Sequence, residues 1–353
     1  MNTPTNRRGT RVPHYALLCL FAASPLHGEI RTWDGGKDTD WSTKQNWDRQ
    51  QWVRPGDDLI FAGSGGTANN NDTTAGTSYS SITFASNAAA FTLSGNSVTL
   101  GGSLTNQSAA LQTVDLALIL PGLRGFETGT GGLQVNGAIS GAGGLQKSGA
   151  GVLTLTGTNT YTGATNLLAS TTFINGTQST GPVAVSAGAT LAGTGLIGGQ
   201  ATISGTHSPG SAAGVAGTQV FSGGLEYAAG SVFTWDLTAA NTSNGFDKVT
   251  GSGALTVSST AIFRVVLGDA IDLNTTFWQA DRSWAAIFTG FTGGNFNNSL
   301  LQVVNRQGQT VPGIGGGHFS IQGTTLEWSA NPEPSSAVTV LLLAAGLLRR
   351  KRS

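Results

Sequence analysis

Residues 141–166 read GAGGLQKSGAGVLTLTGTNTYTGATN, and this stretch decides the fold class of the chain. Leu153 and Leu155 alternate with threonines, which is the period-two pattern of a short strand. Glycines stand at turn spacing on both sides of it, at 149, 151, 157 and 163. Glycine costs about 1 kcal/mol in a helix interior and threonine loses side-chain freedom there. The stretch therefore predicts short strands joined by tight turns.

The same stretch resembles the autotransporter-associated β-strand repeat of bacterial exported proteins. Three elements carry the resemblance: Gly-Gly-Leu-x-Lys-x-Gly-x-Gly at 143–151, Leu-Thr-Leu at 153–155, and Asn-Thr-Tyr-Thr-Gly at 159–163. The resemblance implies one coil of a right-handed parallel β-helix, the passenger-type fold of secreted surface proteins.

Repeat-like sequence extends beyond this unit, and we expect it to cover residues 62–270. Alternating runs are separated by Gly, Asn and Ser at intervals that suit stacked coils, for example at 81–84, 97–100, 133–135, 183–185 and 201–203. The 353 residues include 53 glycines and only 10% charged residues, which suits such coils better than an α/β enzyme domain. The predicted fold class is all-β, with on the order of a dozen coils along a rod about 60 Å long.

Residues 1–28 have the parts of a secretory signal peptide. An apolar region at 15–23 follows a basic region that contains Arg7, Arg8 and Arg11. We expect export by the Sec machinery and cleavage between Gly28 and Glu29; a twin-arginine signal is the less favoured alternative. The chain's one cysteine, Cys19, lies inside this segment, so the mature protein would contain no disulfide and no thiolate metal site.

Residues 29–61 hold four of the eight tryptophans: Trp33, Trp41, Trp47 and Trp52. The segment resembles the leader of such repeat passengers through Trp-Asp-Gly-Gly at 33–36, Asn-Trp at 46–47 and Gly-Asp-Asp-Leu-Ile-Phe at 56–61. Because the open end of a β-helix would pair with other chains, we expect these tryptophans to form an N-terminal cap. A platform on which sugar rings stack is the alternative, and it makes the four residues candidate glycan contacts.

Aspartates in the same segment raise the question of a calcium site. A calcium loop needs oxygen ligands at fixed alternate positions, a turn glycine and a bidentate acid, and Asp38-x-Asp40 supplies only part of this. Turns commonly contain aspartate without any metal. His207, in an expected turn beside Ser208 and Pro209, has no second ligand near it in the sequence. We therefore predict no metal site and no cofactor.

Beyond residue 231 the strands become longer and more aromatic. The segment 271–330 contains Trp278, Trp284 and Trp328. Terminal coils, a C-terminal cap and a small β-sandwich all remain open for this C-terminal β region.

Residues 331–353 resemble the PEP-CTERM protein-sorting signal. The motif Pro332, Glu333, Pro334 precedes an apolar helix at 337–348 and a basic end formed by Arg349, Arg350, Lys351 and Arg352. The resemblance implies recognition by an exosortase, a membrane protease-transpeptidase, in Gram-negative bacteria that make exopolysaccharide. This helix would rise about 18 Å against a hydrocarbon core of about 30 Å. We expect a transient inner-membrane anchor, with a permanent single-pass anchor as the alternative.

Without the signal peptide and the basic tail, 11 Lys and Arg residues face 18 Asp and Glu residues, a formal charge of −7. Nucleic-acid binding requires a basic stripe, so nucleic acid is an unexpected partner.

Three function classes follow, and a non-enzymatic surface or extracellular-matrix protein leads them. A glycan-binding adhesin is second, with exopolysaccharide as its partner. A polysaccharide lyase or hydrolase is third, because it would need carboxylates or a basic residue gathered on one coil face. Between residues 62 and 225 the charged residues are few: Asp72, Asp115, Arg124, Glu127 and Lys147. Lys147 belongs to the repeat motif, and we expect it to solvate a coil corner.

Overall fold

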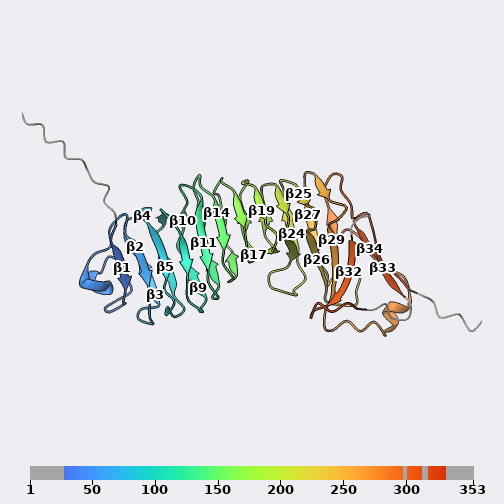
Figure 1. Ribbon diagram of the computed structural model, residues 1–353, viewed down its shortest axis with the longest axis horizontal. Coiled ribbons are helices and arrows are strands. Elements are labelled where there is room, and N and C mark those ends of the chain that lie inside the picture. Colours follow the sequence, from blue (N-terminus) through green and yellow to red (C-terminus); the bar gives the residue numbers. More distant parts are fainter. Residues whose placement is uncertain (1–27, 297–299, 312–316, 331–353) are drawn as a thin grey trace, which may run out of the picture.

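The computed structural model describes residues 28–296, 300–311 and 317–330. Within them the chain is an elongated stack of coils, whose short strands pair in parallel with the equivalent strands of the next coil (Figure 1). The predicted all-β fold of stacked parallel coils is confirmed. The signal peptide, apart from Gly28, and the sorting segment 331–353 lie outside the described residues. Among the residues that are described, no helix has the length and apolarity to cross a membrane.

Two faces of the stack are parallel sheets, each with eleven strands in the described part of the chain. The first sheet contains β1 (Ile30–Trp33), β2 (Asp58–Phe61), β5 (Ser81–Phe84), β8 (Leu104–Asn106), β11 (Arg124–Thr128), β14 (Leu145–Ser148), β16 (Thr165–Leu167), β19 (Val183–Val185), β22 (Ala201–Ile203), β25 (Leu225–Tyr227) and β28 (Leu255–Val257). The second contains β3 (Ala68–Asn71), β6 (Thr92–Gly95), β9 (Gln112–Val114), β12 (Leu133–Val135), β15 (Leu153–Leu155), β17 (Ser170–Ile174), β20 (Ala189–Gly193), β23 (Thr206–Pro209), β26 (Val232–Leu237), β29 (Ile262–Leu267) and β32 (Leu300–Asn305).

The third face consists of shorter strands in two sheets. One contains β4 (Thr77–Tyr79), β7 (Val98–Leu100), β10 (Leu118–Ile119) and β13 (Ile139–Ser140); the other contains β18 (Thr177–Gln178), β21 (Leu196–Ile197), β24 (Thr218–Phe221), β27 (Lys248–Gly251) and β31 (Phe288–Thr289). The Asn-Thr-Tyr-Thr-Gly segment lies between them. The Thr160 amide donates to Ile139 O on one side and the Asn159 amide donates to Thr177 O on the other. The backbone ladder of this face therefore continues through the repeat motif.

The stretch 141–166 forms one coil, as the repeat pattern predicts. It supplies β14 and β15, then the third-face segment, and ends in β16. Register pairs of Leu145 with Thr165, and of Thr165 with Val183, make these two coils 20 and 18 residues long. Of the two glycines between β14 and β15, Gly149 has φ +83°, a left-handed conformation that turns the chain from the first sheet to the second.

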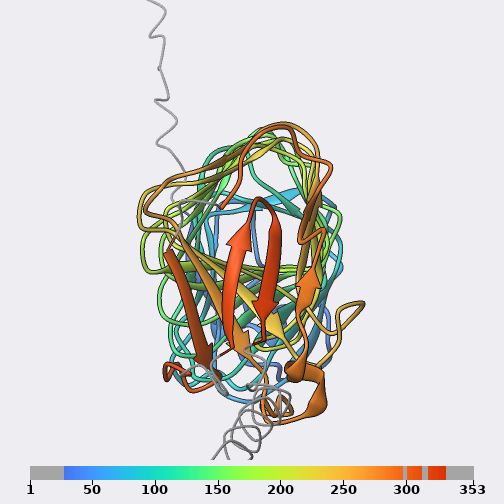
Figure 2. The ribbon, with the colours of Figure 1, turned by 90° about the vertical axis from the view of Figure 1, so that its right-hand side faces the viewer.

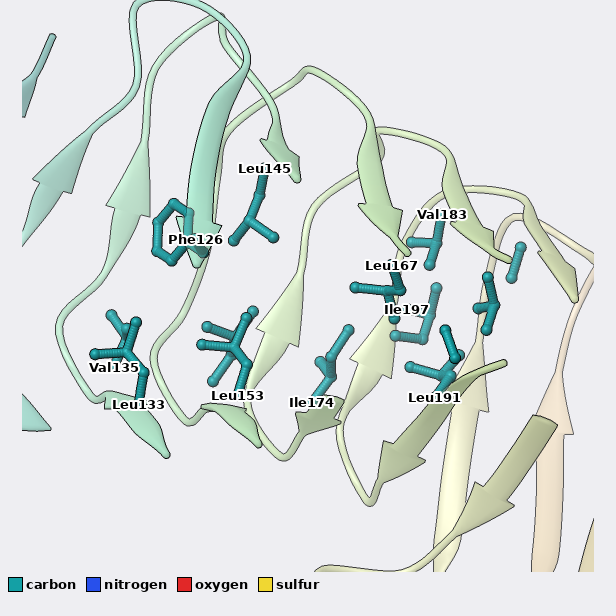
Figure 3. Packing of buried hydrophobic residues seen from close by; sticks show 14 of the residues in the cluster. Phe126, Leu133, Val135, Leu145, Leu153, Leu167, Ile174, Val183, Leu191 and Ile197 are labelled. Atoms are coloured by element: carbon teal, nitrogen blue, oxygen red, sulfur yellow. The ribbon is translucent and has the colours of Figure 1, made fainter. Parts of the chain in front are cut away.

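The interior of the stack is filled by ladders of side chains that share one register position. One ladder in the first sheet runs through Leu59, Ile82, Leu104, Phe126, Lys147, Leu167, Val185, Ile203 and Tyr227, all of them buried. Figure 3 shows residues of both sheets meeting between the faces, including Phe126 and Leu167 from the first and Leu153 from the second. Burial of each such side chain contributes about 1.5–3 kcal/mol, so stacked coils stabilise one another.

The C-terminal end of the stack is covered by an antiparallel sheet of β30 (Arg282–Trp284), β34 (Thr325–Ser329) and β33 (His318–Gln322). Figure 2 views this end and shows the red strands of this sheet in front of the coils. Trp278, in the 3-10 helix η3 (Thr276–Gln279), packs edge-on against Trp328, with ring centroids 5.2 Å apart. Residues 271–330 thus contribute both terminal coil strands, β31 and β32, and a cap.

Parallel pairing begins at Ile30 and includes Asn305. The segment 29–61 therefore holds the first coil strands, β1 and β2, as well as the 3-10 helices η1 (Lys44–Asn46) and η2 (Asp48–Gln50). The coils thus reach beyond residues 62–270 at both ends.

Candidate functional site

Three of the four tryptophans that the sequence singled out lie inside the N-terminal end of the stack. Trp47 packs edge-on against Trp33 and Trp41, with ring centroids 5.2 and 6.1 Å away. Their indole N–H groups are all used, by Gly66 O, Asn69 Oδ1 and Trp41 O. These rings are buried and present no face to a sugar. They pack against Phe61 in the N-terminal part of the core.

Trp52 differs from the other three because 56% of it is exposed. The Lys44 ammonium lies 5.1 Å from the centroid of its ring, a cation–π arrangement. Of the four candidate glycan contacts, Trp52 is the one whose ring is open to solvent.

The aspartates near the N-terminus serve as hydrogen-bond acceptors in turns. Asp38 accepts from the Asp40 amide at 3.0 Å, from Asn46 Nδ2 at 2.6 Å and from Thr43 Oγ1 at 3.0 Å. The hydrogen bond from the Asp40 backbone is the main cause that lowers the pKa of Asp38. No group of three or more potential His, Cys, Asp or Glu metal ligands gathers within the described residues.

The predicted cleavage site adjoins a buried ionic cluster. Asp57 accepts the Glu29 amide at 2.9 Å through Oδ1, and accepts Arg31 Nε at 3.2 Å and the Arg54 amide at 2.8 Å through Oδ2. Arg31 is 2% exposed and also pairs with Glu29 at 2.8 Å. This cluster fixes the start of β1 against the turn that precedes β2.

Lys147 does not solvate a coil corner, and that expectation was wrong. Its side chain is completely buried, in register with Phe126 and Leu167. Strand alternation places Lys147 on the same side as Leu145, which faces the core. Its Nζ donates to the carbonyl oxygens of Ser148 and Gly149 at 2.9 and 3.0 Å. Burial lowers the pKa of Lys147 to about 8.

His207 lies within strand β23 and not in a turn, which corrects a second expectation. It is buried, with Nδ1 2.6 Å from the Tyr227 hydroxyl and Nε2 2.9 Å from Gln219 Oε1. Burial lowers the pKa of His207 to about 4. Thr206 to Pro209 alternate half-buried and buried side chains, and His207 is on the buried side of the strand. The histidine is a hydrogen-bonded member of the core.

The charged residues of the central coils are spread out. Asp115 accepts Asn136 Nδ2, Asp72 accepts the Ser42 amide, and Arg124 Nε donates to Leu100 O. None of the ion pairs found in the described ranges involves these residues or Glu127. The structure does not bring them into one group.

A surface hollow of about 480 Å³ lies beside the later coils, and no sequence pattern points to it. The loop at 210–217, the loop at 238–247 and Arg306 surround it. Its two charged lining residues, Lys248 and Arg306, are 58 positions apart in the chain. No local sequence motif predicts such a site, because these segments are far apart in the chain and only coil stacking brings them together.

The chain matches no model of a known protein family, and no curated protein matches it significantly. The predicted sorting residues, Pro332 to Pro334 and Arg349 to Arg352, lie outside the described residues.

Proposed function

We propose that the protein is an exported, non-enzymatic surface or extracellular-matrix protein built as a right-handed solenoid rod. The observation that carries this proposal is continuous parallel stacking with aromatic covers at both ends. An uncapped coil would offer a free strand edge to other chains. A rod closed at both ends can persist outside the cell as a separate molecule, and its stacked coils resist bending.

Sorting through the PEP-CTERM-like tail is the second part of the proposal. An exosortase-type enzyme would act near Pro332-Glu333-Pro334 while the short apolar helix holds the chain transiently in the inner membrane. The mature chain would then begin near Glu29 and end close to Glu333. Intact-mass measurement on protein from the native host tests this, together with cell fractionation. Recovery of the protein in the matrix or at the surface supports the proposal, and a mass that still contains 348–353 favours a permanent anchor.

We further propose that the protein has no enzymatic activity, and the dispersed charges of the central coils support this part of the proposal. Purified protein incubated with uronic-acid and neutral polysaccharides should release no new reducing ends and no unsaturated products. Turnover that Glu127→Gln or Asp115→Asn abolishes would replace the structural role by an enzymatic one.

Glycan binding is a second candidate, favoured by the exposed ring of Trp52 and the cation above it. A glycan array with the wild-type chain and Trp52→Ala tests it. Trp33 and Trp47 are unsuitable for this test because they are buried and their replacement would damage the cap. Signal lost in Trp52→Ala supports the adhesin role at this end, and signal unchanged removes Trp52 from it.

A further inference from the structure

The hollow beside the later coils is formed by two loops that leave the stack. Residues 210–217 connect β23 with β24, and residues 238–247 connect β26 with β27. Thr218 and Lys248 are register partners at the starts of β24 and β27. Arg306 follows β32 directly and reaches the first loop from another face of the solenoid. At about 480 Å³ the hollow has the size of a small-ligand site.

Both charged side chains in the lining of this hollow are cations, Lys248 and Arg306. This is opposite to the formal charge of −7 that the chain carries without its signal peptide and basic tail. Two carboxyl groups lie behind this lining, Asp236 and Asp247, and Asp247 Oδ1 accepts the Gly217 amide at 2.7 Å. Both are buried and neither lines the hollow, and burial raises the pKa of each, although Arg306 opposes the rise at Asp236. The electrostatic character of the lining therefore favours an anion.

Arg306 is held in place by the loop at 210–217. Its Nη2 donates to Gly214 O at 2.6 Å, and a Cβ atom on Gly214 would lie 3.0 Å from both Cζ and Nη1 of the guanidinium. The other guanidinium N–H groups make no hydrogen bond to the described residues. Because the side chain is exposed, these groups are open to a ligand. A planar fork of donors, fixed from one side, suits a carboxylate.

The remaining lining supplies groups that recognise a sugar ring. Lys248 Nζ lies 4.9 Å from the ring centroid of Phe246, which positions the ammonium at the hollow. Ser243 and Asn244 are exposed in the second loop, and Thr218 and Thr238 add hydroxyl groups. Hydroxyl and amide side chains both donate and accept hydrogen bonds, as sugar hydroxyls require.

We propose that this hollow binds a uronate residue of an acidic exopolysaccharide, with the carboxylate toward Arg306 and Lys248 and the sugar hydroxyls toward Ser243 and Asn244. The choice of a polysaccharide over a small free carboxylate rests on the proposed matrix function. The site would attach the rod laterally to the polymer and leave both capped ends free.

Calorimetric titration of the full chain, purified in a mild detergent, with an oligogalacturonate tests the proposal. We expect saturable binding that weakens with added salt, and a loss of affinity of about tenfold in either Arg306→Gln or Lys248→Gln. Arg49→Gln is the matched control, because it removes one positive charge from an exposed residue at the N-terminal end. It should bind as tightly as the wild type.

Gly214→Ala is a second variant, and it keeps both cations. Its methyl group should displace the guanidinium, and the left-handed φ of +68° at Gly214 adds strain to the loop, so binding should weaken as in Arg306→Gln, with the far-ultraviolet circular dichroism spectrum unchanged. Full affinity in both Arg306→Gln and Lys248→Gln overturns the site.

Titrations with other ligands show whether the hollow prefers a uronate over other anions and over a neutral sugar. Tighter binding of oligogalacturonate than of citrate, a sulfated oligosaccharide or a neutral cello-oligosaccharide supports the uronate assignment. Binding of any of these three as tightly as oligogalacturonate overturns it. Fractionation of cells tests the exported role separately, since a purified chain can bind uronate whether or not it reaches the matrix.

Discussion

Phe126 and Lys147 occupy the same inward position in two successive coils, so that an ammonium group continues a ladder of buried apolar side chains. The ammonium is stabilised there by two backbone carbonyls and by no carboxylate among the described residues. Burying a charge in this way has a cost in stability, and the cost depends on pH.

Lys147→Met should therefore stabilise the protein at pH 7, by about 1–2 kcal/mol, because it fills the same volume without a charge. The midpoint of thermal unfolding measures this. Gln146→Met, at the half-buried neighbouring position, is the control and should change the midpoint little.

The pH dependence has a definite sign. Because the pKa of Lys147 is about 8 in the folded chain and 10.5 in its reference state, the folded chain binds fewer protons between these values. The free energy of unfolding should rise with pH across this window, by up to about 3 kcal/mol. The difference between wild type and Lys147→Met isolates this effect, and parallel pH curves for the two proteins would contradict it.

Acid should weaken the coils around His207. Its pKa is about 4 in the folded chain against a reference of 6.5, so protonation on lowering the pH favours the unfolded state. We expect the free energy of unfolding to fall by about 3 kcal/mol between pH 6.5 and pH 4. Hydrogen exchange of the backbone amides in β23 and β26 measures this loss. His207→Gln should lose this component, while His318→Gln, at an exposed position, should keep it. A His207 imidazole that titrates near pH 6.5 by NMR would refute the prediction.

Two glycines with nearly equal φ allow the effect of backbone strain on stability to be measured separately from the effect of close packing. Gly149 has φ +83° and Gly188 has φ +85°, but an added Cβ would clash with Thr128 O at Gly149 and would meet nothing within 4 Å at Gly188. Gly188→Ala should cost about 1–2 kcal/mol from strain alone. Gly149→Ala should cost at least about 3 kcal/mol, because the coils must also separate. Equal unfolding midpoints for the two variants would show that the clash relaxes freely.

Replacing a tryptophan of the N-terminal segment should destabilise the protein in proportion to how deeply its ring is buried. Trp41→Ala removes a fully buried ring and should destabilise the first coils by about 3–5 kcal/mol. Trp52→Ala should change stability by less than about 0.5 kcal/mol because the ring is largely exposed. Thermal unfolding with hydrogen exchange in β1 and β2 distinguishes them, and a large effect of Trp52→Ala would assign it to the cap.

Asp57 should be essential to the start of the solenoid. Asp57→Ala leaves the buried Arg31 with Glu29 as its remaining ionic partner, a loss of about 3 kcal/mol. Because each coil contacts mainly its neighbours, faster hydrogen exchange should be confined to β1, β2 and β5. Asp115→Ala, at an exposed position, should leave exchange unchanged.

The sequence predicts which side chains of a strand face the core wherever apolar residues alternate with polar ones. Leu153 and Leu155 face the core as their pattern indicates, and the repeat motif forms one coil. Lys147 follows the same alternation two positions after Leu145, although its charge favours an exposed position. The alternation of that strand already placed both on the same side.

The amino-acid sequence was sufficient to predict stacked parallel coils, because glycine turns and period-two strands are local properties of short segments. It also indicated that tryptophans gather at the N-terminus. The folded structure was needed to show which of them are buried, how residues 271–330 cover the other end, and that Gly214, Lys248 and Arg306 line one hollow. Those outcomes depend on which coil lies above which, and loops of different length set that register at positions far apart in the chain.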